Sequence, residues 1–244
     1  MKKRSVQYVA CILASLAVGV QAGITAEAQA DSTMARLRKD MIESHLAPRG
    51  ISNERVLGAF ERVERHLFVD SAFRIHAYED YPLPIGAGQT ISQPYIVALM
   101  TQLVDPRPDD TVLEIGTGSG YQAAILGELA AHVYTIEIVD SLALVAASRL
   151  DSLGYDNITV RSGDGYAGWP DHAPFDVIVV TAAPAEIPQP LLDQLAEGGR
   201  LVIPVGEDWQ ELLLVTRVDG KLVTRKITDV LFVPMTGEAQ KKTK

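Results

Sequence analysis

The feature that most constrains the fold is an alternation, from residue 93 onward, of short β-branched runs with segments of helical periodicity. Apolar runs of this length, separated by helices, are typical of parallel strands that are buried on both faces. Seven strands are predicted, at Thr111–Ile115, Val133–Ile136, Ile158–Val160, Phe175–Thr181, Arg200–Pro204, Leu212–Arg217 and Val230–Val233. Helices are expected between them, at Gln93–Leu103, Gly120–Ala130, Ser141–Leu153 and Pro190–Leu195. The chain therefore belongs to the α/β class.

The end of the chain departs from this alternation, because only a turn around Asp219-Gly220 connects the last two strands. Such a connection makes that pair antiparallel. The 244 residues, of which 47% are hydrophobic, suffice for one ordinary α/β domain with a modest extra segment. We predict a mostly parallel sheet of seven strands with an antiparallel C-terminal hairpin, preceded by an N-terminal helical segment.

The segment before the sheet has helical spacing of its apolar residues between Met34 and Phe68, which predicts two helices. Pro48-Arg49-Gly50 forms the break between them. Ser52 is the expected N-cap of the second helix, although Arg55 stands where a capping box has Glu.

Residues 69–92 contain several Pro and Gly residues and show little periodicity. They are predicted to form a long ordered loop or lid, and loops of this length in compact domains are usually functional.

The first thirty residues have the pattern of a signal peptide, with a basic start followed by an apolar run from Val6 to Val20. The run is shorter than the roughly 20 residues of a membrane-spanning helix. Cleavage is expected after Ala22 or Ala30, in Val20-Gln21-Ala22 or Ala28-Gln29-Ala30. An uncleaved amphipathic anchor is the alternative, but the run lacks a polar face. Cleavage would remove Cys11, the only cysteine, and with it any disulfide or thiolate chemistry.

Charge argues against a nucleic-acid partner, since the formal net charge is −9 at pH 7. Removal of the basic leader makes it more negative, and the sequence shows no local basic groove. Such a surface repels phosphate backbones.

The strongest chemical signal is a glycine-rich turn that follows the strand Val112–Ile115 and precedes a helix. Glycines allow a sharp turn and a close approach of a ligand to the backbone. Gly116, Gly118 and Gly120 are spaced as G-x-G-x-G, whereas the dinucleotide fingerprint is G-x-G-x-x-G. A glycine-rich turn alone is also compatible with a purely structural role.

Two acidic residues follow the next two predicted strands. Glu137 ends the run Val133–Ile136, about 20 residues beyond the glycines, where an acid can accept both ribose hydroxyls. Asp164, in Gly163-Asp164-Gly165, follows the third strand, and its carboxylate can accept from an adenine amino group. Taken separately, Glu137 could be a solvated carboxylate at a strand end, and Asp164 could be an aspartate in a turn. Together with the glycines they predict one nucleoside-shaped crevice at the edge of the sheet.

Several motifs spread over residues 50–236 resemble those of protein-L-isoaspartate O-methyltransferases. They are Gly88–Pro94, Val112–Gln122, Gly163–Gly165, Ala173–Asp176, Val180–Ala183, Gly198–Gly206 and Phe232–Pro234. The resemblance implies a Rossmann-like methyltransferase sheet and S-adenosylmethionine as cofactor. Together with the separately predicted leader, these motifs divide the chain into a signal peptide (1–30), N-terminal helices and lid (31–92), a methyltransferase domain (93–236) and a polar tail (237–244).

The resemblance also implies the roles of individual residues. The methionine part of the cofactor would lie against Gly116, Thr117, Gly118, Ser119 and Gly120 near Glu114, the ribose would meet Glu137, and the adenine would meet Asp164 and Gly165. Ser92 would be the active-site serine. The substrate would contact Thr90, Ile91, Ser92, Thr181, Ala182 and Ala183.

Methyl transfer to a carboxylate requires few catalytic groups. A carboxylate is ionised at neutral pH, so methyl transfer from a sulfonium needs alignment and exclusion of water rather than a metal or a strong base. The sequence has no H-E-x-x-H and no G-x-S-x-G motif, and no metal site is expected. Ser92 would position the substrate carboxylate, although capping of the following helix would also explain it. Likewise, the small residues at 181–183 could merely pack closely.

The resulting prediction is a protein-repair methyltransferase that esterifies the free α-carboxylate of L-isoaspartyl residues in damaged proteins and peptides. Alternatives are a methyltransferase for another carboxylate or a small molecule, and a binding module without turnover. A monomer is expected, with no nucleic-acid partner and no stable membrane insertion once the signal is removed. The leader predicts a periplasmic or secreted protein, whereas the resemblance favours a cytoplasmic one.

Overall fold

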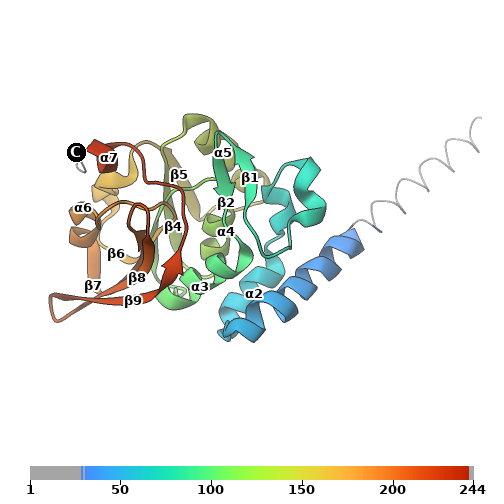
Figure 1. Cartoon of the computed structure of the whole chain (residues 1–244), viewed down its shortest axis with the longest axis horizontal. Helices are drawn as coiled ribbons and strands as arrows, with labels where there is room; N and C mark the ends of the chain where they lie inside the picture. Colours follow the sequence, from blue (N-terminus) through green and yellow to red (C-terminus); the bar gives the residue numbers. More distant parts are fainter. Residues whose placement is uncertain (1–28, 30, 242–244) are drawn as a thin grey trace, which may run out of the picture.

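The computed structural model describes residue 29 and residues 31–241, which form a seven-stranded sheet with helices on both faces (Figure 1). The strand order is β5-β4-β3-β6-β7-β8-β9. The strands span Thr111–Ile115 (β3), His132–Glu137 (β4), Ile158–Ser162 (β5), Phe175–Val180 (β6), Leu195–Val205 (β7), Gln210–Val218 (β8) and Lys221–Val230 (β9). The predicted α/β class and seven-stranded sheet are confirmed.

The predicted C-terminal hairpin is confirmed, with Asp219 and Gly220 at its turn in positive φ. The position of the last strand was wrong, because β9 starts at Lys221 and ends at Val230 rather than spanning residues 230–233. Strand β9 is largely exposed, so its polar sequence gave no strand-like burial pattern. Strand β8 is antiparallel to β7 as well as to β9, while the other pairs of the large sheet are parallel.

The crossover helices are α3 (Pro94–Val104), α4 (Tyr121–Gly127), α5 (Asp140–Ser152) and α6 (Gln189–Asp193). Successive residues of a strand point to opposite faces, so a doubly covered strand must be apolar throughout. In β3, Val112 belongs to the core on one face and Leu113 and Ile115 to the core on the other. Both cores are buried, which accounts for the continuous apolar runs.

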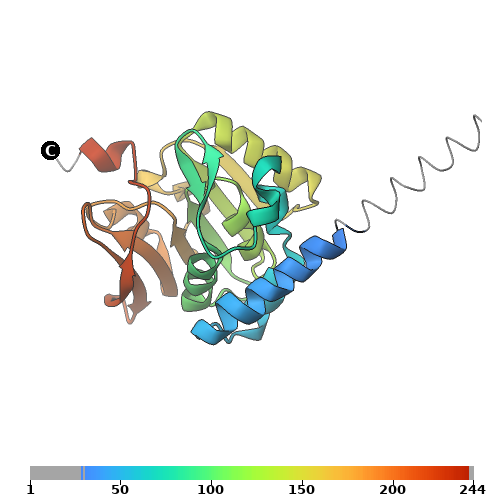
Figure 2. The ribbon, with the colours of Figure 1, turned by 45° about the vertical axis from the view of Figure 1, so that its right-hand side comes forward.

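The N-terminal segment packs on one side of the domain, away from β9 (Figures 1 and 2). A helix over residues 31–41 continues into η1 (Ile42–Leu46) and η2 (Ala47–Arg49), and α2 (Glu54–Arg62) follows. The side chain of Asn53 caps α2 by accepting from the amides of Arg55 and Val56. Prediction of Ser52 as the cap was wrong: the Ser52 amide instead donates to Gln102 Oε1 at 2.8 Å.

The segment 69–92 was predicted as a long ordered loop or lid, and it contains short regular elements. It contains the 3-10 helix η4 (Ser71–His76) and an antiparallel pair of strands, β1 (Leu83–Gly86) and β2 (Gln89–Ile91). A further 3-10 helix, η3 (Arg65–Phe68), precedes it, so the second predicted helix ends early, at Arg62. These short elements escape detection because periodicity needs longer windows.

Short elements complete the chain: η5 (Gly165–Ala167), η6 (Pro170–His172) and α7 (Glu238–Lys241), which lies in the predicted polar tail. Within the described residues, no helix is long and apolar enough to cross a membrane. The predicted signal peptide, with both cleavage sites except Gln29, lies outside the described residues.

Candidate functional site

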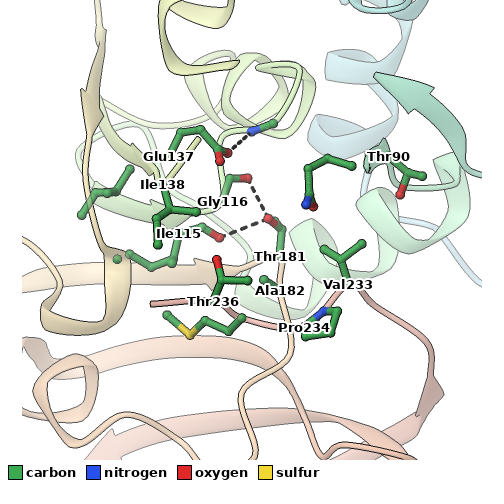
Figure 3. Close-up of a pocket in the computed structure, with 15 residues that line it drawn as sticks. Thr90, Ile115, Gly116, Glu137, Ile138, Thr181, Ala182, Val233, Pro234 and Thr236 are labelled. Atoms are coloured by element: carbon green, nitrogen blue, oxygen red, sulfur yellow. Dashed lines mark hydrogen bonds between the residues drawn. The ribbon is translucent and has the colours of Figure 1, made fainter. Parts of the chain in front are cut away.

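A pocket opens where the carboxyl ends of β3, β4 and β6 meet (Figure 3). These three strands are neighbours in the parallel part of the sheet, so the residues that follow them come together. The strand ends contribute Ile115, Gly116, Gly118, Ile136, Glu137, Ile138, Thr181 and Ala182. Gly165, Gln89, Thr90 and the C-terminal residues Val233, Pro234, Met235 and Thr236 complete the lining. The structure therefore unites segments that are separated by more than one hundred residues.

The glycine turn is held tightly against the end of β6. The Thr181 hydroxyl is positioned to donate to the carbonyl oxygens of Ile115, at 3.1 Å, and of Gly116, at 2.7 Å (Figure 3). Gly116 has φ +96, and a Cβ there would collide with Thr181 Oγ1. Both observations explain why this position accepts only glycine.

The other two glycines of the turn are also in positive φ, at +53 for Gly118 and +88 for Gly120. Gly118 faces the pocket, whereas Gly120 lies against Leu150 of α5 and begins α4. Gly120 therefore serves helix packing, and Gly116 and Gly118 leave the backbone accessible.

Glu137 ends β4 with its buried carboxylate facing the pocket. Its Oε2 accepts from the Gly118 amide at 2.8 Å (Figure 3). Its Oε1 accepts from the Val139 amide at 2.9 Å. These two bonds fix the orientation of the carboxylate, and each oxygen retains a second acceptor position. Glu137 thus joins the glycine turn to the second strand end.

Glu114 is the penultimate residue of β3, two positions before Gly116, and is completely buried. Its Oε2 accepts from the Thr135 hydroxyl at 2.5 Å, and its Oε1 has no partner among the described residues. Burial raises the pKa of Glu114 to about 8, although the Thr135 hydrogen bond lowers it; the charge of Glu137 raises it further. Thr135 in turn meets the Thr117 hydroxyl at 2.7 Å, so a chain of hydroxyls connects Glu114 to the glycine turn.

The Asp164 carboxylate has two hydrogen-bond partners within the protein. Its Oδ1 accepts from the Tyr166 amide at 2.9 Å, and its Oδ2 from the Glu238 amide at 2.7 Å. Asp164 does not line the pocket, but its neighbour Gly165 does. The carboxylate therefore fastens the C-terminal segment beside the site, and its role toward adenine stays a prediction.

Ser92 lies in a second pocket that adjoins the first, together with Ile91, Thr117, Ser119 and Tyr121. Thr90, Gly116, Gly118 and Thr181 line both pockets. This second pocket, called the serine pocket below, therefore places Ser92 next to the glycine turn.

The Ser92 hydroxyl does not cap α3. The N-cap of that helix is Gln93, without a side-chain cap, and Asp80 Oδ1 accepts from the Tyr95 amide at 2.9 Å instead. Among the described residues the Ser92 hydroxyl has no hydrogen-bond partner. The alternative explanation as a helix cap is removed, and the hydroxyl is free for a ligand.

Of the other predicted substrate contacts, Thr181 and Ala182 face the first pocket. Ala183 does not, because it pairs with the C-terminal segment: its amide donates to Val233 O at 2.9 Å and its carbonyl accepts from Met235 at 2.8 Å. The wall formed by residues 233–236 is the largest contribution that the residue-level prediction missed. The motif Phe232–Pro234 was the available signal, but only the fold places it across from Glu137.

The residues present fit S-adenosylmethionine. The backbone is closely packed at two glycines of the lining: a Cβ at Gly116 would collide with Thr181, and a Cβ at Gly165 would collide with Ile115. Glu137 offers acceptors for hydroxyls, and Ile138 is a partly exposed apolar side chain in the lining. Glu114, two positions before Gly116, has an unpartnered Oε1. Among the described residues no group of three or more His, Cys, Asp or Glu side chains could hold a metal ion.

Comparison with known proteins agrees with this geometry. The model of the family Protein-L-isoaspartate(D-aspartate) O-methyltransferase (PCMT) matches residues 36–240. A protein-L-isoaspartate O-methyltransferase of Gloeobacter violaceus is 56% identical over 201 residues, which cover 81% of this chain and 98% of that protein. One from Cupriavidus necator is 50% identical over 239 residues, covering 93% and 91% of the two chains.

Two solved structures share the fold. A protein-L-isoaspartate O-methyltransferase superimposes with a TM-score of 0.77 at 30% identity, covering 83% of this chain and 67% of that one. A structure from Plasmodium falciparum, named for the same activity and in complex with S-adenosyl-L-homocysteine, has a TM-score of 0.70 at 26% identity and covers 83% and 97%. This chain belongs to the protein-L-isoaspartate(D-aspartate) O-methyltransferase family, and its cofactor is S-adenosylmethionine.

Proposed function

We propose that this chain methylates the free α-carboxylate of L-isoaspartyl residues in damaged proteins, with Ser92 as the residue that positions the carboxylate. The observation that carries the proposal is the free hydroxyl of Ser92 in a pocket shared with Gly116, Thr117 and Gly118. Family membership supports the substrate class.

S-adenosylmethionine supplies a methyl group on a positively charged sulfur, which accepts the electron pair of the broken bond. The acceptor carboxylate is already ionised at neutral pH, so no residue has to remove a proton. Ser92 donates a hydrogen bond to one carboxylate oxygen and leaves the other free to attack. Such positioning supplies much of the barrier reduction in a reaction between bound partners.

The small side chains at the end of β6 fit this role. Thr181 lines both pockets, and its hydroxyl is engaged with the carbonyls of Ile115 and Gly116. Ala182 adds little volume beside it. Together they leave room for a polypeptide backbone next to Ser92.

The test is methylation of paired peptides that differ only in an aspartyl or isoaspartyl linkage, with methyl-labelled cofactor. We expect label only in the isoaspartyl peptide, as a base-labile ester. Equal labelling of both peptides, or label that resists base, would reject the proposal. Exclusive labelling of small carboxylic acids would favour the alternative of a small-molecule methyltransferase.

The leader in residues 1–30 supports a second proposal, that the protein is exported to the periplasm or secreted. The basic start and apolar run in the sequence carry it. Fusion of residues 1–32 to a reporter that is active only after export tests it, and a silent reporter would favour a cytoplasmic location.

We also propose that the protein is a monomer, because all the residues that line the pocket come from one chain. Light scattering during gel filtration should give the mass of one chain, and a mass of two chains would refute the proposal.

A further inference from the structure

A long groove runs from Ser92 to Asp208 and Trp209, the two residues that precede β8. Thr90, Ser92 and Thr181 line both this groove and the serine pocket, so the two are continuous. The groove also holds Arg49, Tyr95, Asp208, Trp209, Asp229 and Leu231. A polypeptide whose carboxylate reaches Ser92 would lie along it.

The charged residues of the groove are mostly paired. Arg49 forms an ion pair with Asp80 at 2.5 Å and lies over the Tyr95 ring at 3.4 Å from its centre. Asp229 pairs with Lys226 at 2.9 Å. Asp208 has no hydrogen-bond or ion-pair partner in the part of the chain that the structure describes. It is therefore the one uncompensated charge among the described residues of the groove.

Apolar groups lie beside this free carboxylate. Trp209, the next residue, is 69% exposed, and Leu231 is 87% exposed. Their exposure is unusual for large apolar side chains when several gather in one groove. An indole face together with a carboxylate attracts a cationic side chain through both cation–π and ion-pair interactions.

The loop that carries these residues is held in place. Gln210 is 5% exposed, and its amide nitrogen donates to Phe232 O at 3.1 Å while its amide oxygen accepts from the Phe232 amide at 2.6 Å. These two hydrogen bonds hold Gln210, which follows Trp209, beside Phe232, which follows Leu231. Asp208, Trp209 and Leu231 are thus presented together without a large entropic penalty for ordering the loop.

We propose that Asp208 and Trp209 form a specificity subsite that binds a lysine or arginine side chain of the substrate, near the isoaspartyl residue in sequence. The inference rests on the proposed function, and it adds a preference for basic flanking sequence. Arg49, at the opposite wall, provides no such selection because Asp80 neutralises it.

The test measures kcat/KM for isoaspartyl peptides with neutral flanks and for variants with Lys or Glu at each flanking position in turn. At low ionic strength we expect, at one or more positions, about a three- to tenfold preference for Lys over Glu, as expected for a partly exposed ion pair with a cation–π contact. The Lys peptide should have a lower KM than the Glu peptide and a similar kcat, and the difference should become smaller with added salt.

The matched variants are Asp208→Asn and Glu207→Gln. Both remove one exposed acid from the same loop, but Asp208 lines this groove as well as a neighbouring one, whereas Glu207 lines only the neighbouring one. We expect Asp208→Asn to abolish the preference and Glu207→Gln to retain it. Trp209→Phe should keep most of the preference and Trp209→Leu should lose part of it.

The outcomes separate the two proposals. Absence of a Lys preference at every position, or equal effects of Asp208→Asn and Glu207→Gln, would overturn the subsite while methylation of the neutral isoaspartyl peptide continued. Failure to methylate the neutral peptide would overturn the proposed function itself. Unchanged melting temperatures in all variants would exclude a folding effect.

Discussion

Thr181 and Gly116 bind each other across the two central strands: the hydroxyl of the first is 2.7 Å from the carbonyl oxygen of the second. This bond brings the end of β6 against the glycine turn after β3 and defines one wall of the cofactor pocket. A methyl group at position 116 has no space, because Thr181 Oγ1 occupies it.

Gly116→Ala should therefore abolish binding of S-adenosylhomocysteine in a calorimetric titration. The substitution strains the backbone at φ +96 and displaces Thr181 as well. Gly154→Ala is the matched control, since Gly154 has φ +82 but no atom within 4 Å of the added carbon. The control should lose about 1–2 kcal/mol of unfolding free energy and still bind the ligand. Full binding by Gly116→Ala would show that the cofactor lies elsewhere.

Ser92→Ala should lower kcat/KM for an isoaspartyl peptide by about 10- to 100-fold, because a hydrogen bond to a charged carboxylate contributes about 1.5–3 kcal/mol. The melting temperature should stay unchanged, since the Ser92 hydroxyl has no partner in the described structure. Affinity for S-adenosylhomocysteine should also be retained. A variant that unfolds earlier, with unaltered kcat/KM, would instead indicate a structural serine.

Glu114→Gln should change how stability depends on pH. Burial raises the pKa of Glu114 from its ordinary value near 4.5 to about 8. Between these pH values the folded chain holds the proton that the unfolded chain has released, so the free energy of unfolding falls as pH rises. This loss of unfolding free energy is absent below pH 4.5 and complete above pH 8.

Relative to Glu114→Gln, the wild-type chain without cofactor should thus lose stability between pH 5 and pH 8, by at most about 1.4 kcal/mol per pH unit. Urea unfolding of both proteins at four pH values measures the difference. If the free energies of unfolding of the two proteins changed with pH in parallel, the Glu114 carboxyl would have an ordinary pKa.

Asn53→Ala should destabilise the chain by about 1 kcal/mol, because Asn53 accepts from the Arg55 amide at 3.0 Å at the start of α2. Its side chain also donates to Asp105 at 2.8 Å, which ties α2 to the end of α3. Ser52→Ala, one residue earlier, should have an effect within about 0.5 kcal/mol. Thermal unfolding compares the two, and a larger loss in Ser52→Ala would restore the original assignment of the cap.

Much of the fold could be predicted from sequence because its signals are local. Strand β3 was placed at its observed bounds, since a buried strand that runs into glycines has a pattern of its own. Strand β9 was misplaced because an exposed edge strand of Lys, Thr and Arg residues lacks such a pattern. The β1–β2 pair escaped for a different reason: its strands are only four and three residues long.

The α/β class, the glycines of the turn and the acid at the tip of β4 are encoded locally, since each depends on neighbouring residues. Which polar groups are already engaged depends instead on contacts between distant segments. Asp80 rather than Ser92 satisfies the start of α3, and Asp164 is bonded to Glu238, 74 positions away. A hydrogen bond between distant segments has no periodicity in the sequence, because it depends on how the elements pack.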